Sequence, residues 1–150
     1  MSQTLLVEDL HKRFGSGRRL VWANDGITMS VNAGEVVGLL GHNGAGKTTV
    51  SRIAAARLFP SSGTVEILGE KLGRVDVSEL RPRIGLTSSA LAQHVQDRES
   101  VLGVVLSASY GRIGVWREEY DALDVERARA LLEALGADGL AGRAWGSLSS

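Results

Sequence analysis

The chain has 150 residues, 43% of them hydrophobic, which is enough for one globular domain with a buried core. Lysine plus arginine equal aspartate plus glutamate at 17 each, so the charge balance does not favour nucleic acid as a partner. There is no cysteine, which excludes disulfides and cysteine-based zinc sites.

The N-terminal segment and the length of the apolar runs indicate where in the cell the protein is expected. Residues 1–9 lack a basic stretch followed by an apolar run, which is the pattern of a secretory signal, so we expect a cytoplasmic protein. The longest apolar runs are far shorter than the ~18–20 residues that span a bilayer. If the protein works at a membrane, other chains must supply the spanning helices.

The first part of the chain predicts short strands. Residues 5–7 and 27–31 read as two of them. Residues 35–40 form a continuous apolar run bounded by glycines, which is typical of a strand buried on both faces of a parallel sheet. Residues 64–68 predict a further strand and residues 83–87 a weaker one. We expect Trp22, close to the second strand, to lie in the core.

Apolar residues recur at helical spacing in three places. Residues 50–58 place four apolar side chains on one face, and Pro60 cannot continue that helix. Residues 101–108 and 128–135 show the same spacing, and Gly136 is well placed to end the last helix in the left-handed conformation. We therefore divide the chain at about residue 90 into a mixed α/β part and a helical part.

A glycine-rich loop carries the clearest chemistry. It matches the pattern G-x-x-x-x-G-K-[ST] with Gly41, His42, Asn43, Gly44, Ala45, Gly46, Lys47 and Thr48. Polyphosphate needs many donors in a small volume, and a loop of this kind supplies consecutive backbone N–H groups and then opens a helix whose N-terminus favours an anion. We expect Lys47 to reach the β- and γ-phosphates and the Thr48 hydroxyl to bind Mg²⁺. The alternative is a glycine-rich turn that binds nothing.

The residues around this loop resemble one family. Residues 34–49 are similar to the ABC transporter ATPases, whose loop reads G-x-N/S-G-A/C-G-K-S/T-T. Thr49 matches the last threonine of this pattern. Residues 60–65, 83–86 and 146–150 resemble the family's turn into the next strand, the strand before its Q-loop and the approach to its signature motif. The likeness therefore covers nearly the whole chain.

The resemblance implies an α/β fold. It consists of a P-loop NTPase (RecA-like) core with an N-terminal antiparallel β element, followed by the beginning of an α-helical subdomain. The core takes about residues 1–89, with the phosphate loop, and the subdomain takes about residues 90–150, up to the start of the signature motif.

The family's site residues carry over at matching positions. Phe14 falls where the family places the aromatic ring that stacks on adenine, which suits an aromatic because every base presents a π-face; the alternative is an ordinary core phenylalanine. Ser89 stands where the family has the Q-loop glutamine that binds Mg²⁺. Serine is too short to reach as glutamine does, so we expect a water bridge. The alternatives are that Gln93 takes its place or that this chain couples differently from the family. The signature motif would begin with Leu148, Ser149 and Ser150, and Ser149 would contact the γ-phosphate held by a partner subunit.

No catalytic residue is expected within this chain. Four apolar residues followed by Asp-Glu do not occur, so the resemblance places the general base after Ser150. His11, His42 and His94 lie in the wrong places for the family's switch histidine, and we expect no catalytic or metal role for them. The 150-residue chain alone is therefore expected to be inactive as an ATPase.

The resemblance implies the ATP-binding subunit of an ABC transporter. Its cofactors would be ATP and Mg²⁺, and its partners a second ABC ATPase subunit, arranged head to tail, and a membrane-spanning transporter subunit on the inner face of the cell membrane. The aromatic residues Tyr110, Trp116 and Tyr120 either pack locally or help to form the groove for that membrane subunit. Two alternatives stay open: a soluble ABC ATPase outside transport, and a nucleotide-binding module that does not hydrolyse.

Overall fold

The computed structural model describes residues 3–114 and 119–148. The chain divides into two compact units, Met1–Leu80 and Arg81–Ser150, which are described in turn. The first unit contains the strands β1 Gln3–Phe14, β2 Val21–Asn32, β3 Ser62–Ile67 and β4 Glu70–Lys71 and the helices α1 Lys47–Ala54 and α2 Val77–Leu80. The second contains the helices α3 Ser89–Ala92, α4 Val101–Ser107 and α5 Ala122–Ala134.

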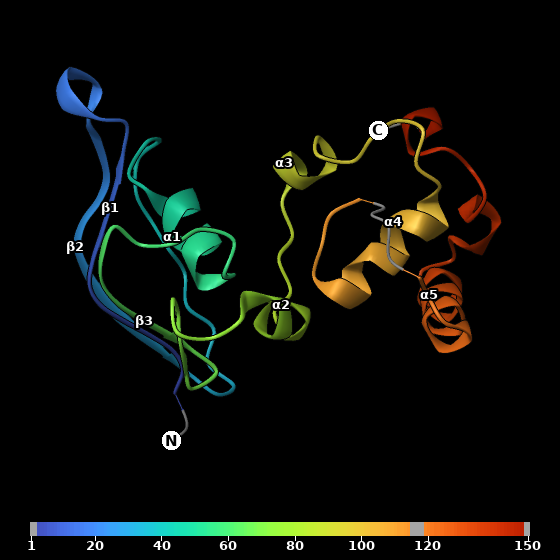
Figure 1. Ribbon diagram of the computed structural model, residues 1–150, viewed down its shortest axis with the longest axis horizontal. Coiled ribbons are helices and arrows are strands. Elements are labelled where there is room, and N and C mark those ends of the chain that lie inside the picture. The colour runs from blue at the N-terminus through green and yellow to red at the C-terminus, as the bar shows by residue number, and fades with distance from the viewer. Residues whose placement is uncertain (1–2, 115–118, 149–150) are drawn as a thin grey trace. The chain divides into compact units, whose positions relative to one another are not determined.

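The first unit is built on an antiparallel sheet with the strand order β2-β1-β3-β4 (Figure 1). This confirms the predicted antiparallel β element at the N-terminus, and the expected strands at residues 5–7, 27–31 and 64–68 fall within β1, β2 and β3, apart from residue 68. The core of the unit consists of side chains from β1, β3 and α1: Val7, Leu10, Val65, Ile67, Val50 and Ile53.

A β-bulge explains why β1 is longer than its sequence pattern predicts. Val7 and Leu10 are both buried, although strict alternation would place residues three apart on opposite faces. The pairing register of β1 shifts between these two residues against β2, and Asp9 between them has a φ of +49°. The extra residue of the bulge brings Leu10 back to the buried face.

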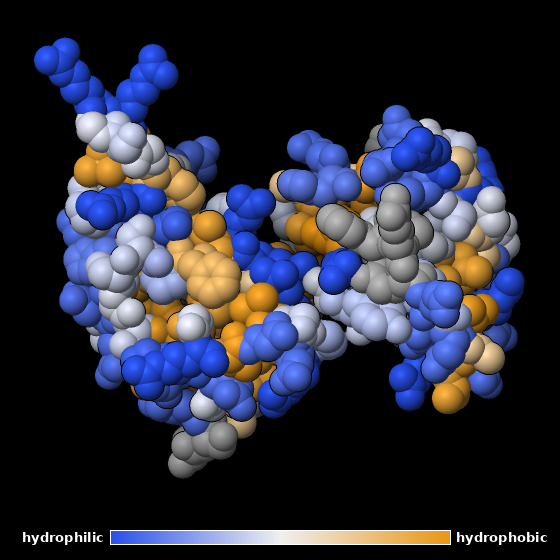
Figure 2. Space-filling view, in the orientation of Figure 1, coloured by the Kyte–Doolittle hydropathy of each residue, from blue (hydrophilic) through white to orange (hydrophobic). Residues whose placement is uncertain are grey.

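The strand predicted at residues 35–40 is not formed, and the expectation that it is buried on both faces is wrong. Val36 and Leu40 are each 97% exposed, and the four strands of the described sheet leave this segment without a neighbour. A strand needs a partner for its N–H and C=O groups, so an apolar run alone does not produce one. Figure 2 shows hydrophobic surface (orange) exposed on this unit.

Two smaller predictions are also wrong. Residues 83–87 form no strand, because the 3₁₀ turn Arg81–Arg83 is followed by irregular chain without a pairing strand among the described residues. Trp22 is 51% exposed and outside the core, where its ring meets the edge of the His11 ring at a centroid distance of 5.9 Å. Helix α1 begins as expected but ends at Ala54, before Pro60, since Ala56 has a φ of +53°.

The second unit is helical. Val101 of α4 and Leu132 of α5 form its core with Ala141, and Leu148 packs against them. The N-terminus of α5 is closed by Asp121, whose side chain accepts a hydrogen bond from the amide of Asp124 at 2.8 Å. In the described part of the chain, no helix combines the length and the hydropathy that crossing a bilayer requires.

Candidate functional site

The predicted phosphate loop lies in the first unit and leads directly into α1. Its turn is closed by a hydrogen bond from the amide of Ala45 to the carbonyl of His42 at 3.1 Å. Helix α1 then starts at Lys47, with Gly46 as its N-cap residue. The motif therefore stands immediately before a helix, which is the context that a phosphate loop requires.

Residue 46 has to be glycine for two reasons. Its φ of +85° lies in the left-handed region, where residues with a Cβ are strained. A Cβ would also overlap the carbonyl oxygen of Ala23 and the side-chain nitrogen of Asn24. The loop is thus packed directly onto β2, and this contact fixes the point at which α1 begins.

Lys47 holds the two ends of the loop together. Its ammonium group donates hydrogen bonds to the carbonyl oxygens of Gly41 and His42, at 2.5 and 2.8 Å. The positive charge therefore lies within the curve of the loop rather than extended into solvent. His42 is exposed, with its ring Nδ1 2.9 Å from the carbonyl oxygen of Asn43.

The start of α1 suits an anion. The first amides of an α-helix have no acceptor within the helix, and together with the helix dipole they attract negative charge. Gly46 supplies no capping side chain, and the first turn of α1 has no acidic residue. Consecutive amides, one ammonium group and the absence of a competing carboxylate in that turn are a donor set that fits a polyphosphate.

The metal ligands predicted from the sequence lie in different units. Thr48 is exposed on α1 in the first unit, whereas Ser89 is the exposed first residue of α3 in the second. Gln93 is also exposed, at the C-terminal end of α3, and Ser88 caps that helix by accepting a hydrogen bond from Ala90 at 3.2 Å. The described residues contain no group of three or more histidine, aspartate or glutamate side chains that could hold a metal ion. A role in binding Mg²⁺ stays a prediction for all three candidate residues.

Phe14 is the last residue of β1 and is 44% exposed. It pairs with Val21 of β2, and the Lys12 ammonium group lies 5.1 Å from the centre of its ring. The ring thus has an accessible surface and a neighbouring cation. Stacking on adenine stays a prediction.

Asn24 is a residue of this site that the sequence did not reveal. It is only 4% exposed, and its side-chain nitrogen donates a hydrogen bond to the carbonyl of Gly46 at 3.3 Å. In the sequence it stands in the run Ala-Asn-Asp-Gly, which reads as a turn before the expected strand at residues 27–31. Its burial follows from the contact between the loop and β2, which no local pattern reports.

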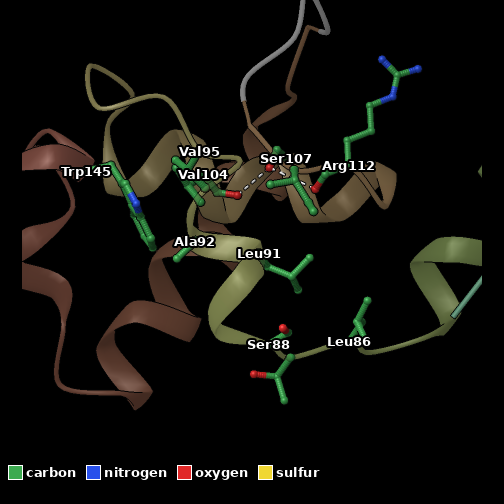
Figure 3. Close-up of a pocket in the computed structure, with 11 residues that line it drawn as sticks. Leu86, Ser88, Leu91, Ala92, Val95, Val104, Ser107, Arg112 and Trp145 are labelled. Atoms are coloured by element: carbon green, nitrogen blue, oxygen red, sulfur yellow. Dashed lines mark hydrogen bonds between the residues drawn. The ribbon is translucent and has the colours of Figure 1, made fainter. Parts of the chain in front are cut away.

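The second unit contains a pocket of about 280 Å³ (Figure 3). Leu91 and Ala92 of α3, Val104 of α4 and Trp145 line it together with Leu86, and the Arg112 side chain points away from them. The hydroxyl of Ser107 donates hydrogen bonds to the carbonyls of Val104 and Arg112, at 2.6 and 3.3 Å. The lining is mainly apolar.

The remaining predicted residues lie in the second unit. The rings of Tyr110 and Tyr120 meet edge to face at a centroid distance of 5.8 Å, and Leu148 is half-buried. Trp116, Ser149 and Ser150 lie outside the described residues.

The chain is similar in sequence to several known proteins. A family model described as ABC transporter matches residues 24–150. A putative ABC transporter ATP-binding protein of Streptococcus mutans is 32% identical over 82% of this chain and 47% of its own length. The uncharacterized ABC transporter ATP-binding protein YlmA of Bacillus subtilis is 37% identical over 85% and 48%, and the phosphonates import ATP-binding protein PhnC of Alcaligenes faecalis is 34% identical over 91% and 50%. The chain thus spans about half the length of the curated relatives it matches.

Solved structures agree on the fold. A dimeric structure of MJ0796, described as a bacterial ABC transporter cassette, superposes with a TM-score of 0.75 at 21% identity, over 97% of this chain and 63% of that one. The ADP conformation of MJ1267, described as an ATP-binding cassette of an ABC transporter, gives a TM-score of 0.65 at 25% identity, over 100% and 60%.

Proposed function

This chain belongs to the ABC transporter family, and we propose that it is the nucleotide-binding part of an ABC transporter's ATP-binding subunit. The observation that carries the proposal is the loop that leads into α1 with the Lys47 ammonium group against the carbonyls of Gly41 and His42. In this proposal the loop binds the β- and γ-phosphates of ATP, and Phe14 stacks on the adenine.

Each group in the loop has a separate part in this binding. The amides at the start of α1 donate to the phosphate oxygens, and Lys47 neutralises part of their charge. Gly44 and Gly46, with φ of +88° and +85°, let the backbone turn its N–H groups inward. The Thr48 hydroxyl would hold Mg²⁺, which supplies charge neutralisation of the phosphates when bound.

Hydrolysis is proposed for the complete, dimeric subunit rather than for these 150 residues. These 150 residues contain no run of four apolar residues followed by Asp-Glu, which is the pattern in which the family resemblance places the general base. Such a group contributes about 10²–10⁴ in rate. We expect these 150 residues to bind ATP and to hydrolyse it at close to the rate of the Lys47→Ala variant.

Two partners complete the proposed function. A second ATPase subunit would pair head to tail and bring the serine of its signature motif to the γ-phosphate, as Ser149 would do in return. A membrane-spanning subunit would place the complex on the inner face of the membrane. Family membership and the import protein among the relatives support both partners.

The test is a calorimetric titration with Mg·ATP. Lys47→Ala is expected to abolish binding, because it removes both the charge that faces the phosphates and the link between the ends of the loop. Arg52→Ala is the matched control, since it removes one positive charge from the exposed side of the same helix. Unchanged affinity in Lys47→Ala, or an equal loss in both variants, would contradict the phosphate-loop proposal.

A further inference from the structure

The contact between the phosphate loop and β2 is built on a β-bulge. Lys12 of β1 lies opposite Asn24, whereas its neighbour Arg13 lies opposite Trp22, so Ala23 is the extra residue of β2. The carbonyl of Ala23 and the side chain of Asn24 occupy the space into which a Cβ at Gly46 would project. The bulge therefore presents one backbone carbonyl and one side-chain amide to the loop.

Asn24 binds the carbonyl at which α1 starts. The carbonyl oxygen of Gly46 accepts two hydrogen bonds, one from the amide of Val50 at 3.0 Å and one from Asn24 Nδ2 at 3.3 Å. The first belongs to the helix, and the second ties the helix start to the sheet. The reverse orientation of the amide would place its oxygen against the carbonyl oxygen of Gly46, and two acceptors repel each other.

The other atom of the amide shows that stability alone does not explain this residue. Asn24 Oδ1 is buried and has no hydrogen-bond partner among the described residues. A buried oxygen without a partner is destabilising, and an apolar side chain of similar volume would fill the same space without that loss. A buried polar atom that lowers stability in this way is expected where its residue contributes to a functional site.

The peptide plane transmits the contact to the loop. The described peptide units are all trans, so the C=O of Gly46 and the N–H of Lys47 point in opposite directions within one rigid plane. A hydrogen bond that fixes the carbonyl therefore also fixes the amide. Because Gly46 has no Cβ and a φ of +85°, its own conformation restrains this plane weakly.

We propose that Asn24 is a positioning residue for the phosphate loop, which holds the Gly46–Lys47 peptide so that the Lys47 N–H points at the bound polyphosphate. This inference rests on the proposed function, since it requires a phosphate ligand. In this proposal a residue of β2 raises the affinity for nucleotide without contacting the nucleotide itself.

The test compares ATP with tripolyphosphate, which has the phosphates but no adenine. In Asn24→Leu and Asn24→Ala the affinity for both ligands is expected to fall by the same factor, about 2- to 12-fold, the value of one hydrogen bond. Asn32→Ala is the control, because it also removes an asparagine side chain from β2. In the described structure the Asn32 side chain forms a hydrogen bond only with Glu35. The Asn32→Ala variant should bind both ligands as tightly as the unchanged protein does. Thermal melts show which variants are folded.

The pattern across the two ligands separates positioning from general damage. A disrupted β1–β2 hairpin would also displace Phe14 and would weaken ATP more than tripolyphosphate, which would overturn the proposal. Wild-type affinity for tripolyphosphate in either folded Asn24 variant would overturn it as well. If the unchanged protein does not bind tripolyphosphate, or if Lys47→Ala still binds it, the proposed function fails as well. If Lys47→Ala loses affinity for tripolyphosphate but the Asn24 variants do not, only the role of Asn24 is contradicted.

Discussion

Phe14 is the residue through which this chain would distinguish a nucleotide from a bare polyphosphate. Its ring is 44% exposed at the end of β1, where it can be covered by a base. Stacking of a base on an aromatic ring contributes about 1–3 kcal/mol, so Phe14→Ala is expected to weaken ATP binding by about 5- to 150-fold. GTP should be affected to a similar extent, because stacking depends little on the identity of the base.

A matched control for this prediction exists within the chain. Phe59 is also 44% exposed, and it lies outside the strands and the loop, so Phe59→Ala removes the same ring from another place. Affinities for ATP, GTP and tripolyphosphate can be measured by calorimetry. A Phe14→Ala variant that binds ATP as tightly as the unchanged protein, or that loses tripolyphosphate as well, would show that Phe14 has only a structural role.

At the scale of elements, the C-terminus of α5 is closed by a glycine in the left-handed conformation. Gly136 has a φ of +64°; its amide bonds the carbonyl of Glu133 at 2.9 Å, and the amide of Ala137 bonds that of Leu132 at 2.8 Å. The left-handed conformation of Gly136 confirms the prediction, and the two hydrogen bonds form a Schellman motif. It matters beyond α5 because Leu132 and Ala137 both belong to the core of the second unit.

Gly136→Ala is therefore expected to destabilise the second unit. A Cβ at Gly136 would have open space around it, so the loss comes from the backbone conformation, at about 1–2 kcal/mol. For a chain of this size that corresponds to a fall of about 2–8 °C in the melting temperature. Gly142→Ala is the control, because Gly142 also has open space but no left-handed φ. Equal melting temperatures for the two variants would contradict this interpretation.

The sequence predicted local structure well and long-range contacts poorly. The helix that follows the glycine-rich loop and the left-handed end at Gly136 depend on nearby residues, and the structure contains both. The antiparallel β element, which the structure also contains, was implied by the family resemblance. The burial of Asn24 depends on a bulge in β2 and on a loop that follows it in the chain, so it could not be predicted. The same holds for residues 36–40, whose apolar pattern is compatible with a buried strand but supplies no neighbouring strand.

At the scale of the whole molecule, the segment at residues 36–40 sets the expected behaviour in solution. Val36 and Leu40 are each 97% exposed, and Val37 and Leu39 about 40%, beside the loop proposed to bind nucleotide. Apolar chain with unpaired N–H and C=O groups is a template for association with other chains. We expect the 150-residue chain to form species larger than a monomer, and we expect the fraction in these species to rise with its concentration.

The double variant Val36→Lys/Leu40→Lys tests this expectation by light scattering over a range of concentrations. It adds two charges at the most exposed positions of the segment, and charges on an unpaired strand oppose edge-to-edge pairing. Leu131→Lys/Leu135→Lys is the matched control, since it adds the same charge on α5, where the two leucines are 58% and 81% exposed on a helix whose backbone is hydrogen-bonded internally. Association should fall in the first variant and persist in the second. If both variants associate to the same extent, exposed apolar area in general drives the association. If the unchanged chain is a monomer at every concentration, residues 36–40 are covered in solution, which would contradict their exposure in the structure.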